Sequence, residues 1–141
     1  MTSPALAPAQ LRVAPVAARL LIIDDDDAIL RLLRLHFERG GWSVDCATER
    51  EEAQALLVNG RYDALIADLR LTPISPSEGL DVIAFARAAN PATRVIAYSG
   101  GSTPDVDRAA HDLGVSAVVR KPVSPGAIED LLRRLLAEVV S

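Results

Sequence analysis

The feature that most constrains this chain is an alternation, repeated five times after residue 18, of a short apolar run and an amphipathic segment. Each run ends in a turn, and the segment that follows carries apolar residues at helical spacing. Short continuous apolar runs are typical of parallel strands that are buried on both faces. The pattern therefore predicts an α/β fold, with a parallel sheet between two layers of helices.

The boundaries of the predicted elements follow from this alternation. Strands are expected at residues 20–23, 42–47, 64–67, 95–98 and 115–119. Helices are expected at about residues 27–39, 49–58, 79–89, 104–114 and from 125 onward. Right-handed crossovers leave few ways to connect five parallel strands, and the common doubly wound order is 2-1-3-4-5. We therefore expect a flavodoxin-like fold, a doubly wound five-stranded parallel sheet with five helices.

Composition sets the domain organisation and excludes several classes of function. The chain has 141 residues, half of them apolar, which suits one domain at residues 18–141. Residues 1–17 hold three prolines and no acid, and we expect a flexible tail there. The net charge of −4 argues against nucleic acid as a partner. No apolar run approaches the ~20 residues that span a membrane, so we expect a cytoplasmic protein without membrane contact.

Polar residues that could form one site follow the first, third, fourth and fifth predicted strands. Asp24 and Asp25 follow the first strand, Asp68 the third and Ser99 the fourth, and Lys121 follows the fifth. In a 2-1-3-4-5 sheet these four strands are neighbours, and ligands bind at their carboxyl ends. Three crowded carboxylates repel one another unless a cation neutralises them, and oxygen ligands suit Mg²⁺ or Mn²⁺. The sequence thus predicts a divalent-metal site at this edge of the sheet.

The same cluster suits a carboxylate that accepts a phosphoryl group. Phosphoryl transfer depends on positioning and on neutralising charge, which a metal, an ammonium and a hydroxyl can do together. The chain contains 14 arginines and a single lysine, Lys121. Its position after the fifth strand indicates that a compact ammonium, rather than a planar guanidinium, is needed there.

Four segments carry a resemblance to a known family. The segments LLIIDDDDAIL, YDALIADLRL, VIAYSG and VVRKPV resemble the receiver domain of two-component response regulators, in the manner of single-domain chemotaxis regulators, over about residues 19–141. The resemblance implies that Asp68 accepts a phosphoryl group from a histidine kinase or a histidine phosphotransfer protein. It also implies that Asp24, Asp25, Asp68 and the backbone carbonyl of Arg70 hold Mg²⁺.

The resemblance assigns roles to the remaining hallmark positions. It implies that Ser99, followed by Gly100, is the switching hydroxyl, and that Lys121 contacts the phosphoryl group. The bond from Lys121 to Pro122 is expected to be cis. Phosphorylation is expected to draw Ser99 inward and to alter the face formed by the fourth helix, fifth strand and fifth helix, about residues 104–140. That face would bind a downstream protein or a second copy of the chain.

The sequence departs from the common receiver pattern in three places. The loop between Asp68 and Gly79 is about three residues longer than usual. Val118 stands where many receivers carry an aromatic residue that swings inward on activation, so that half of the switch is missing. Arg70, two residues after the acceptor, has a long side chain; our hypothesis is that it shields the aspartyl phosphate from water and slows its loss.

Two alternatives to a phosphorylated switch remain open on the sequence. A haloacid-dehalogenase-like phosphatase would need a second aspartate two residues after the nucleophile, where this chain has Arg70. A receiver-shaped interaction module that never takes phosphate is the other. No DNA-binding segment follows the last helix, so we expect a stand-alone regulator that turns over no separate substrate and is not an enzyme.

Other conspicuous residues have structural interpretations. Asp26 and Asp27 are expected to cap the first helix. Leu132, Leu136 and Val140 widen the apolar stripe of the last helix and are candidates for partner contact.

Overall fold

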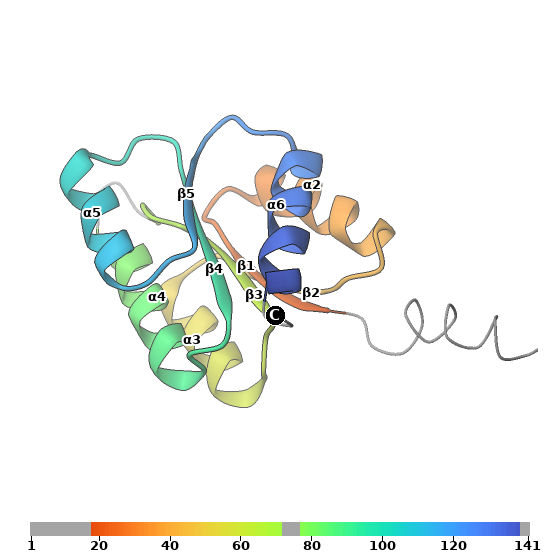
Figure 1. Cartoon of the computed structure of the whole chain (residues 1–141), viewed down its shortest axis with the longest axis horizontal. Helices are drawn as coiled ribbons and strands as arrows, with labels where there is room; N and C mark the ends of the chain where they lie inside the picture. Colours follow the sequence, from red (N-terminus) through yellow and green to blue (C-terminus); the bar gives the residue numbers. More distant parts are fainter. Residues whose placement is uncertain (1–17, 72–76, 139–141) are drawn as a thin grey trace, which may run out of the picture.

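The computed structural model describes residues 18–71 and 77–138 as a five-stranded parallel sheet with helices on both faces (Figure 1). The strands are β1 (Arg19–Ile23), β2 (Ser43–Ala47), β3 (Ala64–Asp68), β4 (Arg94–Ser99) and β5 (Ala117–Arg120). The helices in these ranges are α2 (Asp27–Arg39), α3 (Arg50–Asn59), α4 (Glu78–Ala89), α5 (Pro104–Asp112) and α6 (Pro125–Glu138). The strand order is β2-β1-β3-β4-β5, which confirms the predicted flavodoxin-like topology.

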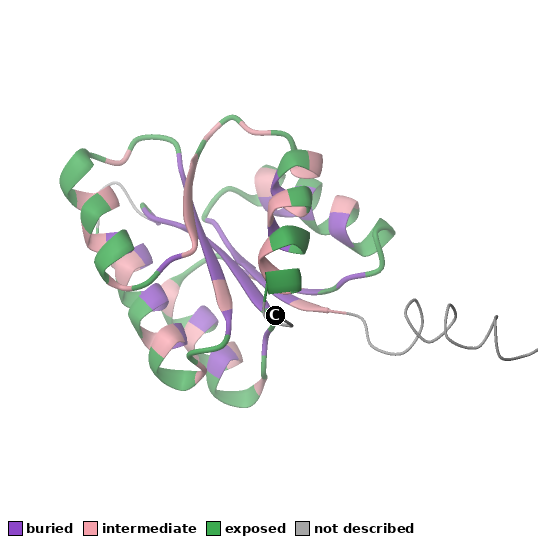
Figure 2. Cartoon of the chain, in the orientation of Figure 1, coloured by how far each residue is buried: buried purple, intermediate pink, exposed green. Residues whose placement is uncertain are grey.

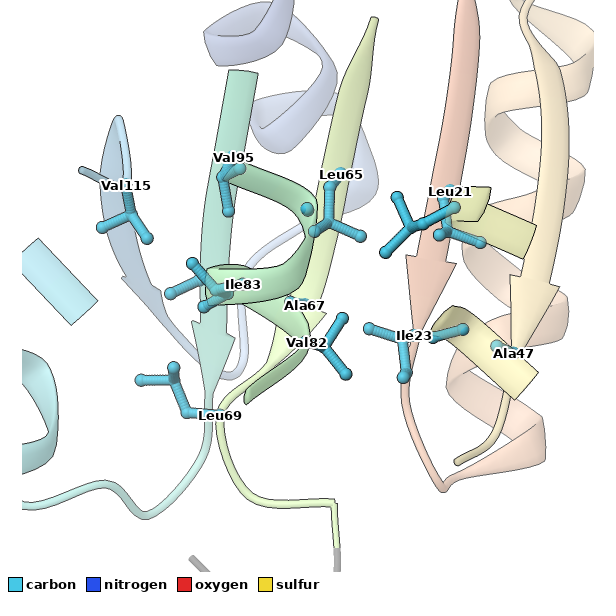
Figure 3. Close-up of a cluster of buried hydrophobic side chains, with 14 of the residues drawn as sticks. Leu21, Ile23, Ala47, Leu65, Ala67, Leu69, Val82, Ile83, Val95 and Val115 are labelled. Carbon is cyan, nitrogen blue, oxygen red and sulfur yellow. The ribbon is translucent and has the colours of Figure 1, made fainter. Parts of the chain in front are cut away.

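Alternation along the strands divides the core into two layers. Leu21 and Ile23 of β1 face α3 and α4, whereas Leu20 and Ile22 face α2 and α6. Figure 3 shows the first of these layers, in which side chains from neighbouring strands meet Val82 of α4. Figure 2 shows the consequence for burial, since the central strands are buried while each helix keeps an exposed outer face. Each fully buried aliphatic side chain contributes about 1.5–3 kcal/mol of transfer free energy.

Side-chain caps fix the start of two helices beside the carboxyl ends of the strands. Asp26 is the N-cap of α2, and its Oδ1 accepts from the Ala28 N–H at 2.9 Å. Asp27 is the acid in the first turn, where its charge favours the helix N-terminus, so Asp26 alone caps α2 through its side chain. Thr103 is the N-cap of α5 and accepts from the Val106 N–H at 3.3 Å.

The structure corrects one expectation for the last helix and leaves others outside the described residues. Leu132 was expected to widen a stripe for partners, but its side chain is fully buried against α2. Leu136 is partly buried against the same layer. Val140, the tail at residues 1–17 and part of the long loop, residues 72–76, lie outside the described residues. Within the described ranges, no helix is long and apolar enough to cross a membrane.

Gly79 allows the first turn of α4 to lie directly against the end of β3. A Cβ placed on Gly79 would lie 2.6 Å from the Cα and the carbonyl oxygen of Leu69, and closer still to the carbonyl oxygen of Asp68. These are backbone atoms, which cannot rotate out of the way. The helix that follows the long loop is therefore packed onto the segment that carries Asp68.

We predict that Gly79→Ala lowers the free energy of unfolding by about 1–3 kcal/mol, because the clash outweighs the better helix propensity of alanine. Gly126→Ala is the matched control. It occupies the same second position of α6, and a Cβ there would meet nothing closer than His36 Cε1 at 4.0 Å. Urea unfolding of both variants tests the prediction, and an equal effect of the two substitutions would contradict it.

Candidate functional site

The predicted polar residues converge at the carboxyl edge of the sheet. Asp24 directly follows β1, Asp68 ends β3, Ser99 ends β4 and Lys121 directly follows β5. Three of them are buried, with exposed fractions of 1% for Asp24, 5% for Asp68 and 1% for Ser99. Four neighbouring strands thus deliver two carboxylates, a hydroxyl and an ammonium to one edge that is largely withdrawn from water.

Lys121 lies between the two buried carboxylates. Its Nζ is 2.7 Å from Asp24 Oδ2 and 3.4 Å from Asp68 Oδ2. The second oxygen of each carboxylate is held by the backbone: Asp24 Oδ1 accepts from the Asp26 N–H at 2.9 Å, and Asp68 Oδ1 accepts from the Arg70 N–H at 3.0 Å. Both carboxylates are therefore fixed in orientation.

Tyr98 also contacts the lysine, a contact that no sequence pattern predicts. The Lys121 Nζ lies 5.0 Å from the centroid of the Tyr98 ring, a cation–π distance. Strand alternation places Tyr98 on the α2 and α6 side of the sheet, so only the path of the chain after β5 brings the two together. The aromatic face adds a further attraction that keeps the ammonium at this edge.

Asp25 extends the acidic cluster toward solvent. One carboxylate oxygen from each of Asp24, Asp25 and Asp68 lies within 4.8 Å of the others. Asp25 is exposed, whereas its two partners are buried. Three converging carboxylates open to water on one side are a donor set that suits a hard divalent cation. Coordination of the cation by the backbone carbonyl of Arg70 stays a prediction.

Burial and mutual repulsion set the protonation of the cluster. Burial, together with the charge of Asp24, raises the pKa of Asp68 from 3.8 to about 6, against the opposing effects of the Arg70 N–H and of Lys121. Burial and Asp24 also raise the pKa of Asp25. Burial would lower the pKa of Lys121, but the bond to Asp24 and the two carboxylate charges outweigh it and raise that pKa. One ammonium thus faces more negative charge than it can compensate.

The Ser99 hydroxyl is held by its own loop. Its Oγ accepts from the Ser102 N–H at 2.9 Å and from the Gly101 N–H at 3.3 Å. Among the described residues, no hydrogen bond joins it to Asp68. The neighbouring Gly100 packs along the lysine stem, since a Cβ there would lie 3.5 Å from Lys121 Cδ.

The segment after β5 is fixed by the backbone. The Lys121 N–H donates to the Ser99 carbonyl at 2.7 Å, and the bond between Lys121 and Pro122 is cis, the isomer that the resemblance implies. Val118 is half-buried and packs against the layer formed with α3, α4 and α5. This strand therefore carries no aromatic side chain at the position where many receivers have one.

Arg70 lies at the rim of the cluster. Its guanidinium packs over the loop after β4, because a Cβ placed on Gly101 would lie 3.4 Å from Arg70 Nη2. A hollow of about 60 Å³ between Leu69, Thr103 and Val106 continues beside it. The side chain therefore extends from the end of β3 to the loop after β4, and its shielding of an aspartyl phosphate stays a hypothesis.

Comparisons with known proteins agree with this geometry. Residues 20–133 match the response regulator receiver domain family. The alginate biosynthesis transcriptional regulatory protein AlgB of Pseudomonas aeruginosa is 37% identical over 107 residues, covering 76% of this chain and 23% of that protein. The response regulator MprA of a Mycobacterium species is 29% identical over 119 residues, covering 84% of this chain and 49% of that protein. The chain spans about a quarter to a half of these curated relatives.

Solved structures show the same architecture. A CheY-like response regulator receiver domain protein from Methanospirillum hungatei superposes with a TM-score of 0.82 at 26% identity, covering 87% of this chain and 96% of that one. A response regulator from Burkholderia pseudomallei, described with a phosphorylated aspartic acid, a calcium ion and citrate, gives a TM-score of 0.76 at 26% identity, covering 86% and 70%.

We predict that Asp68→Asn stabilises the metal-free fold at neutral pH. The raised pKa of Asp68 means that folding favours its neutral form, so this contribution is fully present below pH 3.8 and is lost as the pH rises through about 6. Asparagine does not ionise, so the variant keeps this contribution to the free energy of unfolding at every pH. In EDTA the free energy of unfolding of the variant should exceed that of the wild type by about 1–3 kcal/mol at pH 7.5 and by only about 0.5 kcal/mol at pH 4. Urea unfolding across this pH range measures the difference in free energy of unfolding between variant and wild type. A difference that is independent of pH would refute the raised pKa of Asp68.

Proposed function

We propose a function for this chain from the premise that it belongs to the response regulator receiver domain family. Asp68 accepts a phosphoryl group from a histidine kinase or a histidine phosphotransfer protein, and the phosphorylated chain then engages a downstream partner. The observation that carries this proposal is the bridge in which Lys121 Nζ lies 2.7 Å from Asp24 and 3.4 Å from Asp68. It presents a buried carboxylate beside a cation that a phosphoryl group can share.

The residues divide the chemistry between them. An oxygen of Asp68 forms a bond to phosphorus while the bond from phosphorus to the donor's imidazole nitrogen breaks. Asp68 Oδ1 is engaged by the Arg70 N–H, so Oδ2, on the lysine side, is the attacking atom. The Lys121 ammonium neutralises a phosphoryl oxygen, and Ser99 donates its hydroxyl proton to another once it has moved inward. A pKa of about 6 leaves Asp68 mostly ionised at neutral pH, as a nucleophile requires.

Asp24, Asp25, Asp68 and the backbone carbonyl of Arg70 would hold Mg²⁺ or, in its place, Mn²⁺. Such an ion supplies the positive charge that the phosphoryl oxygens and the excess of carboxylates require. The convergence of three carboxylate oxygens within 4.8 Å supports this donor set. The Burkholderia relative, described with a phosphorylated aspartic acid and a calcium ion, supports it by analogy.

The proposed output is a change at the face formed by α5, β5 and α6, which would bind a downstream protein or a second copy of the chain. The curated relatives are longer proteins, and the transcriptional regulatory protein AlgB is covered over 23% of its length, so the stand-alone arrangement stays a prediction. The domain acts as a cytoplasmic phosphoprotein in two-component signalling and turns over no separate substrate. The phosphatase stays the less favoured alternative, and membership of the receiver family supports the phosphorylated switch over it.

We predict that acetyl phosphate adds one phosphoryl group to the wild type in the presence of Mg²⁺, and that Asp68→Asn abolishes the addition. Asp27→Asn is the matched control, because Asp27 is an exposed acid of the same run outside the carboxylate cluster. Intact-protein mass spectrometry with and without EDTA gives the readout. Absence of any adduct on the wild type would favour an interaction module that takes no phosphate, and continuous release of inorganic phosphate, in place of a stable adduct, would favour a phosphatase.

We also predict that Arg70→Ala shortens the lifetime of the aspartyl phosphate by roughly threefold or more, because the guanidinium that covers the loop after β4 no longer excludes water. Arg108→Ala removes an exposed arginine of α5 and should leave the lifetime unchanged. The decay of phosphorylated protein after removal of acetyl phosphate gives both values. A half-life in Arg70→Ala equal to that of the wild type would contradict the shielding hypothesis.

A further inference from the structure

Three side chains beyond the acidic cluster tie the loop after β4 to α5 and β5. Asp107, in the first turn of α5, accepts from the Ser102 hydroxyl through Oδ1 at 2.5 Å. Its other oxygen, Oδ2, pairs with Arg120 Nη2 at 2.5 Å. The Asp107 side chain is only 17% exposed, whereas that of Asp105, in the same turn, is 91% exposed. We call Ser102, Asp107 and Arg120 the loop clamp.

The loop clamp acts on the residue that holds the switch hydroxyl. Ser102 donates its backbone N–H to Ser99 Oγ at 2.9 Å and its own hydroxyl to Asp107. Arg120 ends β5 and pairs in the strand register with Ser99. Both ends of the clamp therefore lie beside Ser99, one through a direct hydrogen bond and the other across the strand pair.

Inward movement of Ser99 must disturb this arrangement. No hydrogen bond joins Ser99 to Asp68 in the described part of the chain, so reaching a phosphoryl group requires the hydroxyl to move. If Ser99 rotates alone, it gives up the bond from the Ser102 N–H. If the loop moves with it, the Ser102 hydroxyl is drawn away from Asp107. Either path costs a hydrogen bond that the structure shows, from the Ser102 N–H or from the Ser102 hydroxyl.

We propose that Asp107 is a positioning residue for the switch: through Ser102 it holds the Ser99 hydroxyl away from Asp68, while Arg120 holds Asp107 in place from the end of β5. The inference rests on the proposed function and adds its regulation. It also couples phosphorylation of Asp68 to the face formed by α5, β5 and α6 without an aromatic residue at position 118, where this chain has Val118.

The direction of the effect follows from linkage. A contact made only in the unphosphorylated arrangement lowers the affinity for any ligand that requires the other arrangement. Beryllofluoride, which mimics a phosphoryl group on aspartate, is such a ligand. Loss of the clamp should therefore strengthen beryllofluoride binding, whereas ordinary damage to the fold would weaken it.

The test is the affinity of the full chain for beryllofluoride in Mg²⁺, measured by titration with NMR detection of the Ser102 and Arg120 amides. We expect Asp107→Ala and Ser102→Ala to bind about three- to tenfold more tightly than the wild type. Ser102→Thr keeps the hydroxyl and should restore the wild-type affinity. Asp105→Ala is the matched control, because Asp105 pairs only with Arg108 on its own helix among the described residues.

The outcomes separate this inference from the proposed function. Failure of the wild type to bind beryllofluoride overturns the proposed function and the regulation that depends on it. Binding by the wild type, with Asp107→Ala and Ser102→Ala equal to or weaker than Asp105→Ala, overturns the clamp alone. Should Asp107→Ala not fold, Ser102→Ala against Ser102→Thr decides the question by itself.

Discussion

The site depends on one ammonium placed between two carboxylates that have been withdrawn from water. Lys121 lies 2.7 Å from Asp24 and 3.4 Å from Asp68, and these acids are 1% and 5% exposed. A single positive charge cannot compensate both of them together with Asp25, and burial, with the charge of Asp24 added to it, raises the pKa of Asp68 to about 6. The imbalance is what a divalent cation and a phosphoryl group would relieve together. Burial at this edge is thus a source of reactivity as well as of packing.

The sheet makes this arrangement possible and is also the part most accessible from sequence. Four-residue apolar runs such as Leu20–Ile23 indicate strands buried on both faces. Handedness then leaves few strand orders, and the common five-stranded one is the order that the structure shows. Once the order is known, Asp24, Asp68, Ser99 and Lys121 must meet, since each follows or ends a neighbouring strand. The prediction of the cluster therefore required topology alone and no knowledge of side-chain contacts.

What sequence could not supply are contacts set by the path of the loops. The approach of Gly79 to the backbone at Asp68, and the ring of Tyr98 beneath Lys121, depend on ångström-scale positions of segments far apart in the chain. Leu132 was misjudged because a helix with a wide apolar stripe looks alike whether its edge is buried or exposed. The pairing of Asp107 with Arg120 also depends on the path of the loops, since 13 residues and a change from helix to strand separate them.

The most direct test of the account is the rate of phosphorylation by acetyl phosphate in Lys121→Arg, measured with saturating Mg²⁺. Arginine keeps the positive charge but spreads it over a planar fork that cannot occupy the space between two carboxylates as a compact ammonium does. The account predicts that the rate falls by about tenfold or more while the variant remains folded. A rate equal to that of the wild type would contradict it, because any cation would then serve and the bridge from Lys121 to Asp24 and Asp68 would not be what prepares the acceptor.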